Sequence, residues 1–147
     1  MYKRQIEFLI PDMKGKRKDV DTIVESGIDV LNHNVETIPR LYKKVRPGSG
    51  YVRSLTVLRW AKEDAQKSGS KHMMTKSGIM VGLGEKEHEV LSLMDDLRSA
   101  DVDIMTIGQY LRPSDKQLPV KQFITPCLLY TSPSPRDATL SRMPSSA

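Results

Sequence analysis

Three short segments of the sequence carry side chains that could bind a ligand. The first, residues 32–37, combines the amides Asn32 and Asn34 with the carboxylate Glu36. Amides and a carboxylate packed this closely suit hydrogen bonds to a polyhydroxyl or amino-acid ligand. The same residue types also form Asx turns and helix caps, for which Thr37 is suited. The pattern alone leaves both interpretations open.

The second segment, residues 75–85, contains Gly78, Gly82 and Gly84, followed by Glu85. Glycines let the backbone turn tightly and approach a ligand, and a following helix N-terminus offers free N–H groups. The spacing matches neither a P-loop nor a dinucleotide fingerprint. Taken alone, the pattern favours an ordinary turn between a strand and a helix.

The third segment places an amide, Gln109, beside a phenol, Tyr110. Either side chain could face a pocket, or Tyr110 could pack at the rim of the fold. Outside these segments the sequence offers little chemistry: His33, His72 and His88 lack metal-ligand spacing, and the chain contains one cysteine, Cys127. A single cysteine excludes an intramolecular disulfide and a cysteine-ligated cluster or zinc site built from this chain alone.

Charge and hydropathy narrow the class of protein. The net charge is +5, but residues 6–126 contain 19 basic and 17 acidic residues, scattered among one another. Such a distribution is typical of a solvated surface, so no nucleic-acid partner is expected. No apolar run approaches the roughly 18 residues of a membrane helix, and no signal segment follows the basic start of the chain. We therefore expect a soluble intracellular protein without a membrane partner.

The elements that position these segments alternate between strands and helices. Four β-rich runs cover residues 6–10, 28–31, 73–81 and 103–109. Helical periodicity covers residues 18–26, 51–67 and 86–99, and a short helix follows Thr37 with Pro39 in its first turn. On the helix at 51–67, the apolar positions are Val52, Leu55, Leu58, Ala61 and Ala65. This order predicts an α/β fold of about four parallel strands with crossover helices, as in half of an α/β barrel or an open doubly wound sheet.

The two ends differ in character from the middle of the chain. Residues 127–147 are rich in Ser and Pro and are predicted to be a disordered, non-native tail, and residues 1–5 to be a non-native scar. The fold is therefore assigned to residues 6–126. These are fewer than the roughly 250 residues of a complete α/β barrel.

Several strings within 6–126, taken together in the same order, resemble the lipoyl synthase family of the radical S-adenosylmethionine (SAM) superfamily. They are residues 29–37, 45–48 with Tyr51 and 54–55, 75–85, 106–114, 118–120 and 125–126. The resemblance implies that 6–126 is the C-terminal part of a partial, six-stranded β/α barrel of the TIM type. It also implies an enzyme, a sulfurtransferase that inserts two sulfur atoms into an octanoyl chain on a lipoyl carrier domain.

The cofactors that the resemblance implies are SAM and two 4Fe-4S clusters. The partners that it implies are an octanoylated lipoyl carrier domain or glycine cleavage H protein, and an electron donor such as ferredoxin or flavodoxin. The expected compartment is the cytoplasm, or the mitochondrion in a eukaryote. Carried over position by position, the resemblance assigns a SAM pocket to Asn34, Glu36, Gly78, Gly82, Gly84, Glu85, Gln109 and Tyr110, and substrate or carrier contacts to Asn32, Arg46 and Lys76.

The chain departs from the family pattern at its cluster ligands. The Cys-x-x-x-Cys-x-x-Cys loop, the auxiliary-cluster cysteines and the Arg-Ser-Ser-Tyr string are absent from the sequence. No catalytic residue or metal ligand is therefore assigned, and the polypeptide as written is expected to be an inactive fragment. Two alternatives remain: a different β/α-barrel enzyme or domain that binds a phosphorylated or nucleoside ligand, and a small basic module that binds acidic partners.

Overall fold

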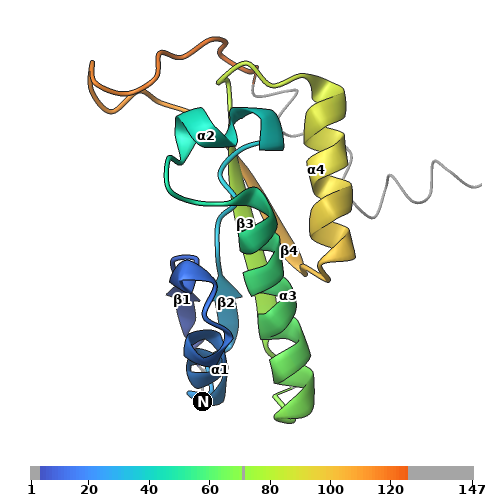
Figure 1. Ribbon diagram of the computed structural model, residues 1–147. Coiled ribbons are helices and arrows are strands. Elements are labelled where there is room, and N and C mark those ends of the chain that lie inside the picture. The colour runs from blue at the N-terminus through green and yellow to red at the C-terminus, as the bar shows by residue number, and fades with distance from the viewer. Residues whose placement is uncertain (1–3, 71, 126–147) are drawn as a thin grey trace, which may run out of the picture.

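The computed structural model describes residues 4–70 and 72–125, which form one parallel sheet with helices (Figure 1). The predicted segments at 1–5 and 127–147 lie wholly or mostly outside the described residues. The predicted alternation of strands and helices is confirmed. The elements are β1 (Glu7–Leu9), η1 (Met13–Gly15), α1 (Arg17–Glu25), β2 (Val30–Asn32), η2 (Pro39–Leu41), α2 (Tyr42–Val45), α3 (Tyr51–Lys67), β3 (Met74–Val81), α4 (Glu87–Ser99) and β4 (Ile104–Gln109).

The four strands pair in the order β1-β2-β3-β4, and every pair is parallel, as predicted. Each crossover passes through at least one helix, because parallel neighbours need a long connection. The chain after β2 continues alongside β3: the Lys76 carbonyl accepts from the His33 N–H at 3.0 Å, and the Gly78 carbonyl accepts from the Glu36 N–H at 2.9 Å. This extension carries the first candidate segment along the sheet.

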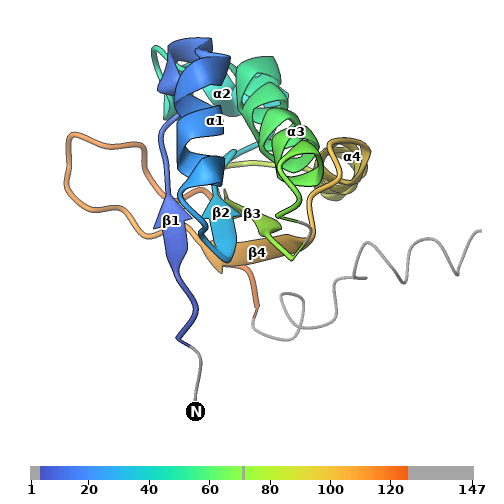
Figure 2. The ribbon, with the colours of Figure 1, turned by 90° about the horizontal axis from the view of Figure 1, so that it is seen from below.

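The helices lie on one side of the sheet (Figure 2). One core lies between the sheet and the helices α1 and α3. A second core lies between the sheet, α3 and α4, and includes residues of the segment that follows β2. The first contains Val20, Val24, Leu31, Val57 and Ala61, and the second contains Val35, Leu58, Ile79, Leu93 and Leu97. No described helix covers the opposite face of the sheet. Such an open face agrees with part of a β/α barrel, in which the inner face of the sheet lines the barrel.

Two local features differ from what the sequence pattern indicates. Val52 belongs to the periodic apolar positions of residues 51–67, but its side chain is 74% exposed. The buried side of α3 instead contains Ser54, Val57, Leu58, Ala61 and Ala65. Ser54 can be buried because its hydroxyl forms a hydrogen bond with the Tyr42 hydroxyl. Thr37 was one candidate cap for the short helix, but Ile38 is the N-cap residue and the Thr37 hydroxyl is buried without a partner among the described residues. Pro39 lies in the first turn, as predicted.

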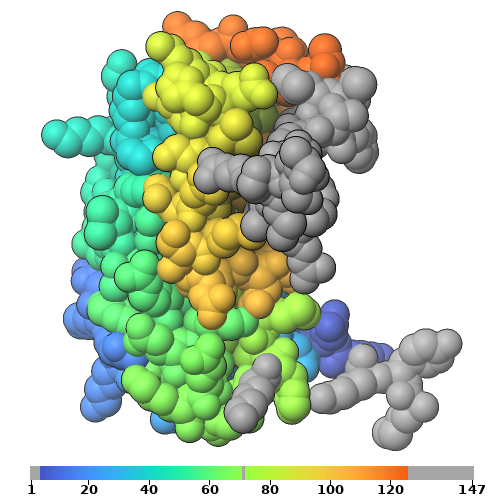
Figure 3. All heavy atoms as spheres, turned by 90° about the vertical axis from the view of Figure 1, so that its right-hand side faces the viewer, coloured from blue at the N-terminus to red at the C-terminus, as the bar shows by residue number. Residues whose placement is uncertain are grey.

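Residues 111–125, which we call the arm, leave the end of β4 and pass over the strand ends. The Gly82 carbonyl accepts from the Lys121 N–H at 2.8 Å, and Leu118, Val120 and Ile124 pack against the second core. Figure 3 shows the arm above α4 at this end of the molecule. Among the described residues, no helix is both long and apolar enough to cross a membrane.

Candidate functional site

Polar side chains from three segments converge on the open face of the sheet around Gly78. A Cβ atom built on Gly78 would lie 2.8 Å from the Thr106 Oγ1 and 2.9 Å from the Asn34 Oδ1. Gly78 and Thr106 are register partners on β3 and β4, so both residues present the same face. Only glycine therefore lets the amide of Asn34 and the hydroxyl of Thr106 approach the same point. The combination offers donors and acceptors to a ligand bearing hydroxyl or amino groups.

A second polar layer lies one pleat earlier on the same face. The Lys76 Nζ donates to both carboxylate oxygens of Glu7, at 3.0 and 3.1 Å, and the Asn32 Nδ2 donates to the Glu7 Oε1 at 2.8 Å. The Lys76 ammonium, and after it the Asn32 amide, lowers the pKa of the Glu7 carboxyl below its usual range. The two residues predicted to contact substrate, Asn32 and Lys76, are thus joined through Glu7, which the sequence did not single out. The Asn32 Oδ1 is buried and has no partner among the described residues.

Glu36 pairs with Ile79 of β3, next to Gly78, and has a left-handed backbone conformation with φ 68°. Its carbonyl accepts from the Met80 N–H at 2.8 Å, which locks it against β3. The side chain is half-buried, and no described residue donates a hydrogen bond to its carboxylate. A non-glycine residue held in this conformation is uncommon and is often found at functional sites. Glu36 is therefore available to a ligand on geometric grounds.

The glycine-rich turn at 82–84 is closed by a carboxylate of the chain itself. The Glu85 Oε2 accepts from the backbone N–H groups of Gly82, Leu83 and Gly84, at 2.9, 3.0 and 3.1 Å. These amides form an anion-binding turn, but Glu85 already fills it. A phosphate would have to displace this carboxylate, so the geometry disfavours the alternative of a phosphorylated ligand at the turn.

Arg40 fastens the same turn to the first residues of α4. Its Nη2 donates to the Gly84 carbonyl at 2.9 Å, and its Nε and Nη2 donate to the two Glu89 oxygens at 2.7 and 2.8 Å. This bidentate pair, with the Lys86 N–H, lowers the pKa of Glu89 to about 2. Glu85 and Arg40 together fix the loop that follows β3.

Gln109 and Tyr110 hold the arm in place. The Gln109 Nε2 donates to the Gln122 carbonyl at 3.2 Å, and its Oε1 accepts from the Ile124 N–H at 2.8 Å. The Tyr110 hydroxyl donates to the Leu118 carbonyl at 2.9 Å, and its ring is buried in the second core. The structure therefore joins these two predicted pocket residues to the arm and not to the polar group around Gly78. Gly82 is part of the same junction, because a Cβ there would collide with the Gln122 carbonyl oxygen.

Arg46 supports the first segment from behind. Its Nη1 donates to the Asn34 carbonyl at 2.6 Å, and its guanidinium carbon lies 5.9 Å from the centre of the Tyr42 ring. The Tyr42 hydroxyl shares a buried hydrogen bond of 2.8 Å with the Ser54 Oγ. Arg46 was predicted as a substrate contact; the observed bond adds that it fixes the backbone of a candidate ligand-binding residue.

His33 lies on the helix-covered side, because it alternates with Asn32 and Asn34 along the chain. Its Nδ1 donates to the Ile10 carbonyl at 2.9 Å, which leaves Nε2 as a buried acceptor without a partner among the described residues. Burial is the main cause that lowers the pKa of His33, so the ring is neutral near pH 7.

Thr106 and Glu7 are the site residues that the sequence reasoning missed. Thr106 belongs to a quoted string, but only the register between β3 and β4 places it beside Gly78. In the described residues, no group of three His, Cys, Asp or Glu side chains could hold a metal ion.

Comparison with known proteins gives a consistent result. A family model described as "Radical SAM superfamily" matches residues 2–97. A lipoyl synthase from Caldanaerobacter subterraneus subsp. tengcongensis is 53% identical over 121 residues, which cover 82% of this chain and 41% of that protein. The lipoyl synthase of Christiangramia forsetii is 51% identical over 121 residues, with 82% and 39% covered. A protein of Nematostella vectensis named "Lipoyl synthase, mitochondrial" is 51% identical, with 82% and 40% covered. The chain thus spans about two fifths of the length of these relatives.

Proposed function

The chain belongs to the radical SAM superfamily, and on this premise we propose that it is the part of a lipoyl synthase that binds SAM on the open face of its sheet. In the whole enzyme the reaction would be the insertion of two sulfur atoms into an octanoyl chain carried by a lipoyl carrier domain or H protein. The observation that carries the proposal is the convergence of Asn34, Gly78 and Thr106, in a chain about half identical to proteins named lipoyl synthase.

The residues around Gly78 fit a SAM molecule. The missing Cβ of Gly78 lets an amide and a hydroxyl approach the same point of the open face, and Glu36 adds a carboxylate without a described partner. These groups would hold the hydroxyl and amino groups of the ligand, with Arg46 keeping the backbone of Asn34 in place. Bound SAM supplies the radical chemistry that removes hydrogen from the octanoyl chain. Glu85, Gln109 and Tyr110 would act at a distance from SAM by fixing the turn and the arm.

The residues present do not fit a 4Fe-4S cluster. Such a cluster requires several thiolate ligands, and the 147 residues include only Cys127, which lies outside the described residues. We therefore propose no step through a cluster for this chain. The chain by itself should show no cluster absorbance after treatment with iron, sulfide and SAM, and a stable 4Fe-4S spectrum would contradict this statement.

The remaining elements of the proposal concern the setting of the whole enzyme. A reductant such as ferredoxin or flavodoxin would supply electrons. The compartment would be the cytoplasm, or the mitochondrion in a eukaryote; the name of the Nematostella relative includes the word mitochondrial.

A chimeric enzyme tests the proposed function. Residues 6–126 would replace the matching segment of the Caldanaerobacter lipoyl synthase, and lipoylation of a carrier domain would be measured in cells that lack their own lipoyl synthase. We expect lipoylation from the chimera and a loss of at least about tenfold when Asn34→Ala is introduced, because a lost hydrogen bond to a bound ligand is worth roughly 1.4 kcal/mol or more. A chimera that folds, binds both clusters and gives no lipoylation would overturn the proposal.

A further inference from the structure

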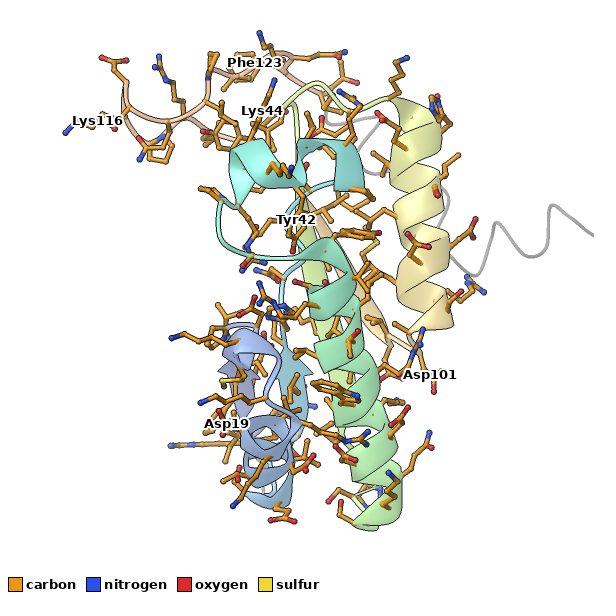
Figure 4. The ribbon with its side chains drawn as sticks, viewed as in Figure 1. Asp19, Tyr42, Lys44, Asp101, Lys116 and Phe123 are labelled. Carbon is orange, nitrogen blue, oxygen red and sulfur yellow. The ribbon has the colours of Figure 1, made fainter. Side chains whose placement is uncertain are left out.

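The end of the molecule at which the strands finish carries amines without ion-pair partners. Lys43 and Lys44 on α2, and Lys116 and Lys121 on the arm, are exposed, and none of them has an ion-pair partner among the described residues. Figure 4 shows Lys44, Lys116 and Phe123 at this end, whereas Asp19 and Asp101 lie toward the other. We call Lys43, Lys44, Lys116, Lys121 and Phe123 the basic rim.

A chain of contacts links the segment that leads into α2 to the arm. Arg40, in the η2 turn that leads into α2, donates to the Gly84 carbonyl at 2.9 Å. The stem of Lys121 passes over Gly84, with its Cγ 3.7 Å from the position of a Cβ on that glycine. The arm is itself fixed by Gln109 through the Gln122 carbonyl and the Ile124 N–H. The arm and the segment that leads into α2 are therefore held at the same end of the molecule by defined hydrogen bonds.

Three acidic side chains at this end are engaged, whereas Glu87 at the start of α4 is exposed and has no ion-pair partner among the described residues. Glu85 accepts from the turn amides, Glu89 pairs with Arg40, and Asp115 pairs with Arg112 at 3.1 Å. The four lysines consequently leave a local excess of positive charge. Phe123 adds an apolar contact, because its side chain is 70% exposed, and Leu111 on the same arm is 67% exposed. Aromatic side chains such as Phe123 are enriched at protein interfaces, and complementary charge around such a contact steers the encounter with a partner.

We propose that the basic rim is the docking surface for an acidic, folded carrier domain. This inference rests on the proposed function, since that function requires a protein-borne chain to reach the strand ends beside Gly78. The rim borders those strand ends, so a domain docked on it would deliver its modified side chain toward the open face. Complementary charge would speed the encounter and orient the carrier, while Phe123 would provide a buried contact.

Charge reversal on the full chain tests the proposal. The probe is a purified, octanoylated lipoyl carrier domain with a net negative charge, and its dissociation constant is measured by titration calorimetry at two salt concentrations. The variant Lys44→Glu/Lys116→Glu should bind about tenfold or more weakly, since reversing two charges at an interface rim opposes an acidic partner. The control Lys16→Glu/Lys18→Glu changes the net charge equally, at exposed positions around the start of α1, and should bind as the parent does. Circular dichroism verifies that each variant folds like the parent.

The possible results separate this inference from the proposed function. Equal weakening in both variants, or in neither, would overturn the docking surface but leave the proposed function standing. Absence of carrier binding, with rim-dependent binding of a double-stranded oligonucleotide, would overturn the inference in favour of a nucleic-acid surface. Lipoylation by the chimera together with carrier binding that does not respond to the rim would show that the carrier docks elsewhere.

Discussion

Gly78 offers the most direct test of the candidate site. Replacing it with alanine would place a methyl group 2.8 Å from the Thr106 Oγ1 and 2.9 Å from the Asn34 Oδ1. Real Cβ atoms do not approach other heavy atoms this closely, so the strand or one of the two side chains must move. Both neighbours are short side chains attached to paired or bridged backbone, which limits how far they can retreat.

Two opposing effects set the size of the change in stability. Alanine in place of glycine in a strand normally stabilises a protein by about 0.5–1 kcal/mol, because it restricts the unfolded chain. Overpacking a tight contact normally costs about 1–3 kcal/mol. The second effect should dominate at position 78, so Gly78→Ala should lower the free energy of unfolding by about 1–2 kcal/mol.

Gly108 provides a matched control on the neighbouring strand. Its register partner is Met80, and a Cβ built on it has no atom within 4 Å outside its chain neighbours. Gly108→Ala should therefore leave the free energy of unfolding unchanged or raise it by about 0.5 kcal/mol. Urea denaturation followed by circular dichroism would measure both variants.

A second mutation identifies the contact responsible. Adding Thr106→Ala removes one of the two close atoms, so the double variant should recover about 1 kcal/mol relative to the sum of the single changes. If Gly78→Ala and Gly108→Ala behave alike, or if Thr106→Ala gives no recovery, the close approach around Gly78 does not exist and the proposed SAM site loses its structural basis.

Three further predictions concern the turn, its clamp and the buried histidine. Gly82→Ala should lower the free energy of unfolding, measured by urea denaturation, by at least about 2 kcal/mol. Gly48 has a similarly positive φ but no atom near the position of a Cβ, so Gly48→Ala should lower it by only about 1 kcal/mol. Equal losses in the two variants would exclude the contact between Gly82 and the arm. Arg40→Met should raise the pKa of the Glu89 carboxyl from about 2 toward its ordinary value, as measured by NMR titration, and an unchanged value would show that the pair does not form. Because burial lowers the pKa of His33, the unfolded state binds more protons than the folded state below about pH 6.5, so the free energy of unfolding should fall on acidification from pH 7 to 5. His33→Asn should make this fall with pH smaller. An unchanged pH dependence in the variant would show that His33 is not buried in its neutral form.

The sequence predicted the elements better than their contacts. The boundaries of α3, the four strands and their parallel arrangement follow from periodicity and from the length of the crossovers. Val52 escaped this reasoning because Val52 and Ser54 lie on different sides of α3, and the hydroxyl of Ser54 is buried against Tyr42. The periodicity of apolar residues cannot detect a polar residue that is buried by a specific hydrogen bond.

The candidate site was predicted as separate segments, and their roles diverge in three dimensions. Asn34 lies against Gly78, whereas Gln109 and Tyr110 are occupied by the arm. Lys76 pairs with Glu7, which lies 69 residues earlier in the sequence. Neither partnership could be read from spacing, because each depends on the register of strands that are distant in the chain.

The sequence by itself determined the order of strands and helices, the glycine positions and the family to which the chain belongs. These properties depend on local periodicity and on strings of neighbouring residues. The tertiary structure alone decided that Glu85 fills the glycine turn, that Gly78 brings Asn34 and Thr106 together, and that the arm lies at the same end of the molecule as α2. These contacts join segments that are distant in the sequence. They are determined by the register of the strands and by the packing of side chains, and both exist only once the sheet has formed.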